Sequence, residues 1–268
     1  MSQTGCGNIL MVVAEKTGVR PADQAIKTMF EVWGYTMGLI SDHDNQNSFV
    51  GGADRNDVVF VAESVDPTKL VSKVSAATIG VVNADGWIND ELGFESADSS
   101  NWPVGNTNEI TDTSHYITAP LAAGSLSIYD AHMGGLAIGN TPAPDLQSLA
   151  AWGSDTGLAV LESGASMASG GSAAGRRVML PFGRDDSMDW SRLNNSGQLI
   201  LQRAISWGMG AGKTSAGKLL LVVADAASPL TSETDRKSLI ESWGYEVTLI
   251  SDHASQGDFD TALADVDV

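Results

Sequence analysis

The sequence predicts an α/β fold: a flavodoxin-like, three-layer domain with a parallel sheet and an antiparallel extension, followed by part of a second copy. Three observations predict it. Short apolar runs alternate with helical patterns early in the chain, later segments alternate polar and apolar residues, and the beginning of the chain recurs near its end. The predicted boundaries are residues 8–208 for the complete domain, 209–217 for a Gly-rich linker and 218–268 for a partial β-α-β repeat.

Alternating strands and helices are predicted in the first part of the domain. Residues 8–14 form the apolar run typical of a buried parallel strand, and Pro21 begins a helix that ends at Gly34. Asp66-Pro67 begins a second helix. Further strands are expected over residues 36–41, 57–62 and 78–83. Because β and α units alternate, the strands should lie parallel with helices on both faces.

An antiparallel extension is predicted beyond Gly86, because apolar residues there alternate with polar ones. Strands are expected over residues 110–119, 125–130, 134–139 and 157–162. Arg176–Pro181 returns to the pattern of a buried strand, and Ser196–Trp207 forms a closing helix. Three tryptophans are expected in the core at helix ends: Trp33, Trp152 and Trp207.

The internal repeat joins Asn8–Val58 to Lys218–Val268. The two segments align without a gap at a constant offset of 210, and 18 of the 51 positions are identical. Such a match through strand, helix and strand predicts a duplication. Because a β-α-β piece cannot bury both faces of its strands alone, we expect residues 218–268 to pack against a neighbouring chain or a longer continuation.

The excess of acidic residues excludes two classes of binding partner. Lys and Arg number 15 against 33 Asp and Glu, which gives a net charge of −18. Such a surface repels nucleic acid and anionic membranes, so neither is expected as a partner. No stretch reaches the ~18 apolar residues of a membrane span. The acidic composition favours an extracellular or cell-surface location, with a virion as a further setting, although no signal peptide is visible.

Several motifs distinguish the domain over most of residues 8–208. They are Trp33-Gly34-Tyr35, Ser41-Asp42, Thr113–Ile117 followed by Gly124, Arg176–Gly183 and Ala204–Trp207. Together these motifs resemble class I glutamine amidotransferase-like domains, including the trehalose-utilisation type. The resemblance implies the α/β fold of that group.

The catalytic nucleophile of that group is missing. Amidotransferases carry a Cys, paired with a His, at a tight turn from strand to helix. The corresponding turns hold Glu63-Ser64-Val65 and Asn83-Ala84-Asp85, and the single cysteine, Cys6, precedes the first strand. Glutaminase activity is therefore not expected.

Ser64 is a candidate substitute nucleophile. His115 or His43 would act as its base, and Asp42 would be the third member of a divergent hydrolase site. Ser64 lacks the flanking glycines of a nucleophile elbow, and its position before Asp66-Pro67 also fits a helix cap. Both interpretations stay open at this point.

Two pairs of residues are candidate ligand-binding positions. Asp42 and His43 recur in the second copy and follow a strand, where α/β folds place ligands, although Asp is also a frequent turn residue. Trp87 and Trp102 lie in polar segments rich in Gly and Asn. We expect both tryptophans to be exposed and to contact a sugar or a protein.

Two acidic stretches match part of a calcium-binding loop. Their residues are Asp42, Asp44 and Gln46 in the first stretch and Asp185, Ser187 and Asp189 in the second. The first stretch lacks the Gly and the closing Glu of a complete loop. Calcium is therefore the metal that the pattern suggests, and no other cofactor is expected.

The duplication, the acidity and the missing nucleophile predict a non-catalytic structural or interaction module. It would be repeated in tandem in a surface, extracellular or virion assembly, for example as a filament subunit that binds copies of itself or neighbouring domains. The alternatives are a divergent hydrolase and a carbohydrate- or small-ligand-binding domain. The sequence leaves open whether the protein is an enzyme, and it favours a protein that is not.

Overall fold

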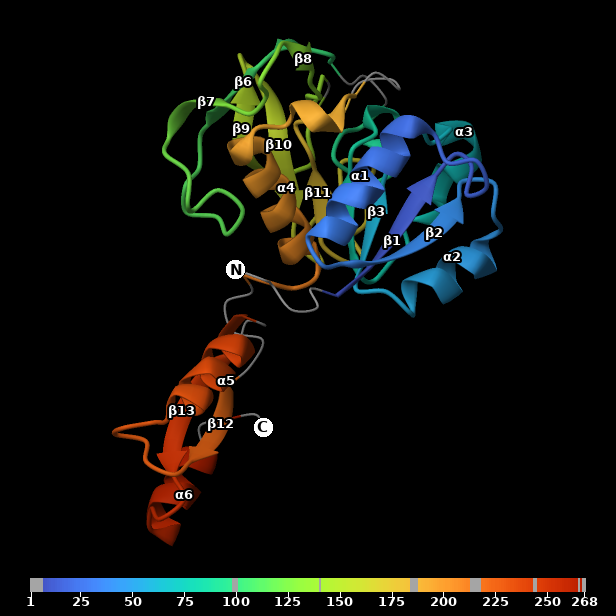
Figure 1. Ribbon diagram of the computed structural model, residues 1–268. Helices are drawn as coiled ribbons and strands as arrows, with labels where there is room; N and C mark the ends of the chain where they lie inside the picture. Colours follow the sequence, from blue (N-terminus) through green and yellow to red (C-terminus); the bar gives the residue numbers. More distant parts are fainter. Residues whose placement is uncertain are drawn as a thin grey trace. The chain divides into compact units, whose positions relative to one another are not determined.

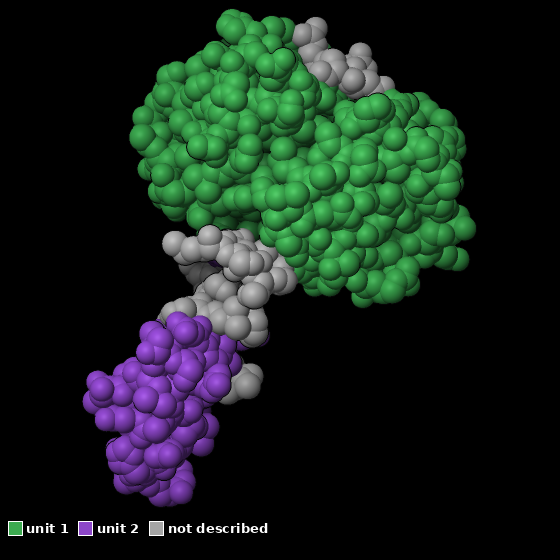
Figure 2. All heavy atoms as spheres, in the orientation of Figure 1, with its two compact units in different colours: residues 1–209 green, residues 210–268 purple. Residues whose placement is uncertain are grey.

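The computed structural model describes residues 7–97, 101–139, 141–183, 188–212, 218–242, 245–264 and 266 of the 268-residue chain. The chain divides into two compact units (Figure 2), unit 1 over Met1–Met209 and unit 2 over Gly210–Val268. Cys6, Asp185 and Ser187 lie outside the described residues.

Unit 1 is built on one nine-stranded sheet with the order β2-β1-β3-β4-β11-β10-β9-β6-β7 (Figure 1). The first five strands pair in parallel: β1 (Asn8–Val13), β2 (Thr36–Ser41), β3 (Val58–Val61), β4 (Gly80–Asn83) and β11 (Arg177–Met179). The other four pair antiparallel: β6 (Thr107–Ile110), β7 (Gly124–Ser127), β9 (Gln147–Trp152) and β10 (Asp155–Leu161). The predicted α/β fold with an antiparallel extension is confirmed.

Helices cover both faces of the parallel part. Helices α1 (Pro21–Val32) and α4 (Asn195–Gly208) pack on one face, and α2 (Gln46–Ala53), α3 (Pro67–Leu70) and the 3-10 turn η1 (Val71–Lys73) pack on the other. The side chains of β1 show why both faces are needed. Ile9, Met11 and Val13 join the core under α1, whereas Leu10 and Val12 join the core under α2, because successive residues of a strand point to opposite faces.

Local side-chain hydrogen bonds explain where the structure departs from the expected elements. The strand expected over residues 110–119 ends at Ile110, because the Asp112 carboxylate accepts hydrogen bonds from the backbone and hydroxyl of Ser114 and turns the chain. Helix α2 was not expected, and the side chain of Asn45 caps its first turn by accepting from Ser48 N. Trp152 lies at the end of strand β9 and not at a helix end.

Short elements complete unit 1. Strands β5 (Val104–Gly105) and β8 (Met133–Gly134) form a separate antiparallel pair, and the 3-10 turns η2 (Gly86–Ile88) and η3 (Trp190–Arg192) follow β4 and precede α4, respectively. Asp85 caps η2 and Asp189 caps η3 through side-chain hydrogen bonds to backbone amides.

Unit 2 contains four elements in the order of the first four of unit 1. They are β12 (Lys218–Val223), α5 (Thr231–Ser242), β13 (Glu246–Ser251) and α6 (Gln256–Leu263). Each begins and ends 210 residues after its counterpart β1, α1, β2 or α2. Strands β12 and β13 pair in parallel with Lys218 opposite Glu246, as Asn8 lies opposite Thr36 in unit 1.

Across the described parts of both units, no helix has the length and apolar character that crossing a lipid bilayer requires.

We predict that Gly80→Ala destabilises unit 1. A Cβ atom at Gly80 would lie 2.2 Å from the backbone oxygen of Gly208, so strand β4 and the end of α4 would have to separate. The free energy of unfolding should fall by about 3 kcal/mol in urea titrations followed by circular dichroism.

Gly51→Ala is the matched control for this prediction. Its Cβ atom would meet the end of the flexible Arg55 side chain inside helix α2, where Ala is favoured over Gly. Equal losses in the two variants would show that the contact between Gly80 and Gly208 does not limit stability.

Candidate functional site

The strand order creates a switch point at the carboxyl ends of β1 and β3. From β1 the chain crosses to β2 on one side, and after α2 it enters β3 on the other side of β1. In open α/β sheets of this order, ligands bind in the crevice that forms where the connections diverge. The fold therefore directs attention to the loops after β1 and β3.

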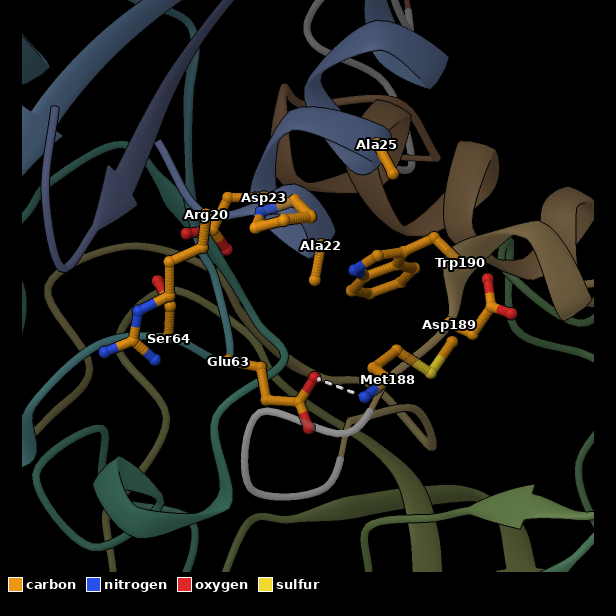
Figure 3. Close-up of a pocket in the computed structure, with 10 residues that line it drawn as sticks. Arg20, Ala22, Asp23, Ala25, Glu63, Ser64, Met188, Asp189 and Trp190 are labelled. Atoms are coloured by element: carbon orange, nitrogen blue, oxygen red, sulfur yellow. Dashed lines mark hydrogen bonds between the residues drawn. The ribbon is translucent and has the colours of Figure 1, made fainter. Parts of the chain in front are cut away.

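A pocket of about 520 Å³ lies at this switch point (Figure 3). Its walls come from the start of α1, from the turn after β3 and from the segment that leads into η3. The lining residues are Arg20, Pro21, Ala22, Asp23, Ala25, Glu63, Ser64, Met188, Asp189 and Trp190.

Two buried carboxylates and an indole ring line the pocket, together with the exposed side chains of Arg20 and Asp189. Asp23 is buried in the first turn of α1, where the helix dipole favours a negative charge. Glu63 is buried and accepts a hydrogen bond of 3.1 Å from Met188 N, as Figure 3 shows. Trp190 is held by edge contacts with Phe60 and Phe182. The pocket is suited to a small ligand with hydroxyl groups or positive charge.

Sequence reasoning missed Asp23, Glu63 and Trp190. Asp23 follows Pro21 at a predicted helix start, and Glu63 is the neighbour of Ser64, so both positions follow strand ends of the parallel sheet. Their place after a strand end is the feature of the sequence that could have identified them as site residues. Trp190 offered none, because its segment is distant in sequence and meets the pocket through tertiary packing.

The hydroxyl of Ser64 is hydrogen-bonded to the backbone of another loop. Ser64 Oγ accepts a hydrogen bond of 3.2 Å from Ala14 N, and Ser41 Oγ donates one of 2.7 Å to Ala14 O. These bonds tie the loops after β2 and β3 to the end of β1. The cap of α3 is Asp66, whose carboxylate accepts from Thr68 N, so Ser64 is not the cap that its sequence position suggested.

Asp42 is fully buried beside the same loops. Its Oδ2 atom accepts a hydrogen bond of 2.7 Å from Asp66 N, and its backbone oxygen accepts one from Lys73 Nζ. His43 is half-exposed, with Nε2 at 3.5 Å from Asp42 Oδ1. In unit 1 this Asp therefore fastens the end of β2 to the start of α3.

The repeated pair has a different environment in unit 2. Asp252 and His253 are both exposed there, with His253 Nδ1 at 3.2 Å from Asp252 Oδ1. Asp42 is buried and Asp252 is exposed, so their shared sequence does not give the two copies one common site.

His115 and Ser64 lie at opposite ends of the parallel strands. The ring of His115 packs against Trp207 near the end of α4, with 5.1 Å between ring centroids, and the adjoining Gly208 packs on Gly80 at the start of β4. Ser64 follows the end of β3. The parallel strands separate the two side chains, so His115 cannot accept a proton from Ser64.

His43 and Ser64 both lie at the carboxyl ends of the parallel strands, and each side chain has other described partners. The hydrogen bond that the structure describes for Ser64 Oγ comes from Ala14 N, and the ring of His43 lies beside Asp42 and Glu15. A nucleophile and its base need direct hydrogen-bond contact or one intervening water. The contacts described for these two side chains include no hydrogen bond between them.

The acidic residues considered for calcium have other partners. Asp44 accepts hydrogen bonds from Lys16 Nζ and from Ser41 N, and the bond with Lys16 is the main reason that its pKa is lowered. Asp189 accepts from the amide and hydroxyl of Ser191. Among the residues that the structure describes, no three His, Cys, Asp or Glu side chains gather as a metal site would require.

Trp87 and Trp102 come together in the folded chain. Their ring centroids are 5.4 Å apart with planes inclined by 45°, and 41% of Trp87 is exposed. Trp102 packs partly on the core below it. The two residues predicted as a contact surface therefore form one aromatic patch, reached through η2 at the carboxyl end of β4.

Comparison with known proteins supports the fold alone. No known family model matches the sequence, and no curated protein matches it. One solved structure with a similar fold is that of a ThuA-like protein from Bacteroides uniformis, with 14% identity and a TM-score of 0.50. The match covers 80% of this chain and 95% of that one. Unit 1 thus has the class I glutamine amidotransferase-like fold.

We predict that His115 makes stability depend on pH. Burial lowers its pKa below 6.5, so the unfolded chain binds this proton more readily than the folded protein does. The contribution of neutral His115 to stability is therefore complete above pH 6.5 and is lost as the pH falls below that value. The free energy of unfolding in urea should fall less between pH 7.5 and pH 5.5 in His115→Asn than in wild type. The Asn side chain can still accept the hydrogen bond from Ile117 N.

His132→Asn changes an exposed histidine and is the control for this prediction. An identical pH dependence in wild type and His115→Asn would contradict the role given to His115.

Proposed function

We propose that this chain is a non-catalytic interaction module, in which unit 1 keeps an amidotransferase-like frame and unit 2 is part of a second copy of that domain. The observation that carries the proposal is strand β12 of unit 2, which has the apolar sequence of a central strand but pairs on one edge among the described residues. Such a strand is suited to pair with a further strand, either from a longer continuation of this chain or from a neighbouring chain.

The equivalence of the two copies supports the duplication. Identical residues at 18 of 51 positions accompany four elements whose bounds all differ by 210, and the two strand pairs share one register. Independent origins would not produce equal loop lengths throughout. The duplication supports a role as a tandem or self-associating subunit, for example in a filament.

The hydrogen bonds at the carboxyl edge support the lack of catalysis. Ser64 holds Ala14 and Asp42 holds Asp66, so the polar groups of a would-be hydrolase connect loops. The net charge of −18 and the small-residue composition support an extracellular, cell-surface or virion setting, as part of the same proposal.

Hydrolysis assays test the proposal. We expect purified chain and its Ser64→Ala variant to hydrolyse aryl esters, anilides and aryl glycosides at the same background rate. Ser64→Ala leaves Ala14 N without its partner and should cost about 1–3 kcal/mol, so folding of the variant must be verified by circular dichroism. Turnover that disappears in folded Ser64→Ala would establish the divergent hydrolase instead.

A second candidate function is carbohydrate or small-ligand binding in unit 1. It is favoured by the pocket at the switch point, which combines two buried carboxylates with a tryptophan wall, and by the patch formed by Trp87 and Trp102. This function is compatible with an interaction module.

Binding to a glycan array tests this second candidate. Glu63→Gln removes one of the two buried carboxylates of the pocket but keeps an oxygen that can accept from Met188 N, and it should weaken binding by about tenfold or more. Glu109→Gln changes an exposed residue of β6 and is the control. Equal binding by both variants would place the ligand outside the pocket, and Trp87→Ala then tests the aromatic patch.

A further inference from the structure

A compact turn at residues 115–119, the His115 turn, packs against the end of α4 between strands β6 and β7 of the chain. The backbone oxygen of His115 accepts hydrogen bonds of 3.0 Å from Thr118 N and 2.8 Å from Ala119 N. The ring atom Nδ1 accepts a third, of 3.2 Å, from Ile117 N. His115 therefore holds the turn together through both its backbone and its side chain.

The His115 turn closes the core beneath α4. Ile117 is fully buried in the core that also contains Trp207, and the ring of His115 packs on the indole of Trp207. Arg203 of α4 donates from Nε to the backbone oxygens of Tyr116 and Ile117, and its guanidinium lies 4.0 Å from the centroid of the Tyr116 ring. Two side chains, His115 and Arg203, thus fasten the turn to α4 through separate contacts.

The hydrogen bond from Ile117 N fixes the protonation state of His115. A backbone N–H can only donate, so Nδ1 must present a lone pair, and the proton of the neutral ring lies on Nε2. A second proton would make Nδ1 a donor that faces the N–H of Ile117. The Nε2 atom is buried and has no hydrogen-bond partner among the residues that the structure describes. The closed turn therefore disfavours a protonated ring.

The charged groups that act on His115 come from its own segment and from three neighbouring elements. They are Asp112 in the same segment, Glu162 after β10, Arg176 before β11 and Arg203 on α4. The two acidic groups favour a proton on His115 and the two basic groups oppose it, so burial is the main reason that the pKa of His115 is lowered.

The indole of Trp207 already has a cation beside it. The guanidinium of Arg176 lies 4.3 Å from the centroid of this indole, and its Nε atom is 3.0 Å from Glu162 Oε2. A protonated His115 would place a second positive charge against the same ring, where Glu162 is engaged with Arg176. Both the hydrogen bond and the charges around the indole thus oppose a protonated ring in the closed turn.

We propose that the His115 turn is a pH-sensitive latch on the end of α4. Proton uptake by His115 breaks the hydrogen bond from Ile117 N and moves the ring off Trp207 into solvent. Arg203 keeps its bonds to the turn, and the rest of unit 1 stays folded. The ring can leave without crossing the core, because His115 is only half-buried in the closed turn.

Opening of the latch uncovers part of the indole of Trp207, two residues before unit 1 ends at Met209. The latch is closed above pH 6.5 and opens as the pH falls below that value, because the closed turn binds the proton less readily than a free histidine does. It gives unit 1 an apolar surface at acidic pH that is covered at neutral pH.

Nuclear magnetic resonance of the full chain tests the latch. In a titration from pH 7.5 to pH 4.5, the ring signals of His115 should shift together with the indole N–H signal of Trp207. The protection factor of the Ile117 amide in hydrogen exchange, taken relative to an unstructured peptide at each pH, should fall by about tenfold. The amides of β1 and β3 should keep their protection.

Two variants separate the latch from a purely structural role of His115. His115→Asn keeps an acceptor for Ile117 N but cannot take up a proton, so the protection factor of Ile117 should be the same at both ends of the titration. Glu162→Gln keeps an oxygen for Arg176 Nε and removes a charge that favours protonated His115, so the latch should open at a lower pH. His132→Asn changes an exposed histidine and should behave as wild type does.

Four results would overturn the latch. They are an unchanged protection factor of Ile117 in wild type, an equal fall in His115→Asn, an opening pH that Glu162→Gln does not lower, and loss of protection in β1 and β3 at the same pH as in the turn. The last result would show that unit 1 unfolds as a whole.

Discussion

Strand β1 must have neighbours on both edges and cover on both faces, and the rest of unit 1 follows from this requirement. Its apolar residues alternate between two cores, one under α1 and one under α2. Pairing with β2 on one edge and β3 on the other satisfies its backbone and at the same time creates the switch point. The pocket lies there because the connections leave β1 in opposite directions.

Different hydrogen bonds join the loops at the amino ends and at the carboxyl ends of the parallel strands. At the amino edge, the buried guanidinium of Arg177 donates to the backbone oxygens of Ser75, Ala77 and Ile79, and burial lowers its pKa to about 10. Together with the contact of Gly80 and Gly208, these bonds close that edge. The carboxyl edge has loops joined by single side-chain bonds, which leave space between them for a ligand.

Polar side chains at the carboxyl edge of the parallel strands hold this amidotransferase-like fold together. Ser64 accepts a hydrogen bond from Ala14 N and Asp42 accepts one from Asp66 N, so both side chains join one loop to the next. Unit 2 repeats the first four elements with the same loop lengths, but its Asp252 and His253 are exposed. The two segments share their helices, strands and strand register, whereas residues at matching positions differ in burial.

The sequence by itself determined the alternation of strands and helices, the bounds of β1, β2 and α1 within about two residues, and the recurrence of residues 8–58 at 218–268, because each depends on local pattern or residue type. It also pointed to Ser64, Asp42 and Trp87 at strand ends. Tertiary structure alone decided that His115 lies across the sheet from Ser64, that Trp190 lines the pocket and that Trp87 meets Trp102. The physical reason is that these facts depend on pairing order and packing between segments far apart in the chain, which no local period encodes.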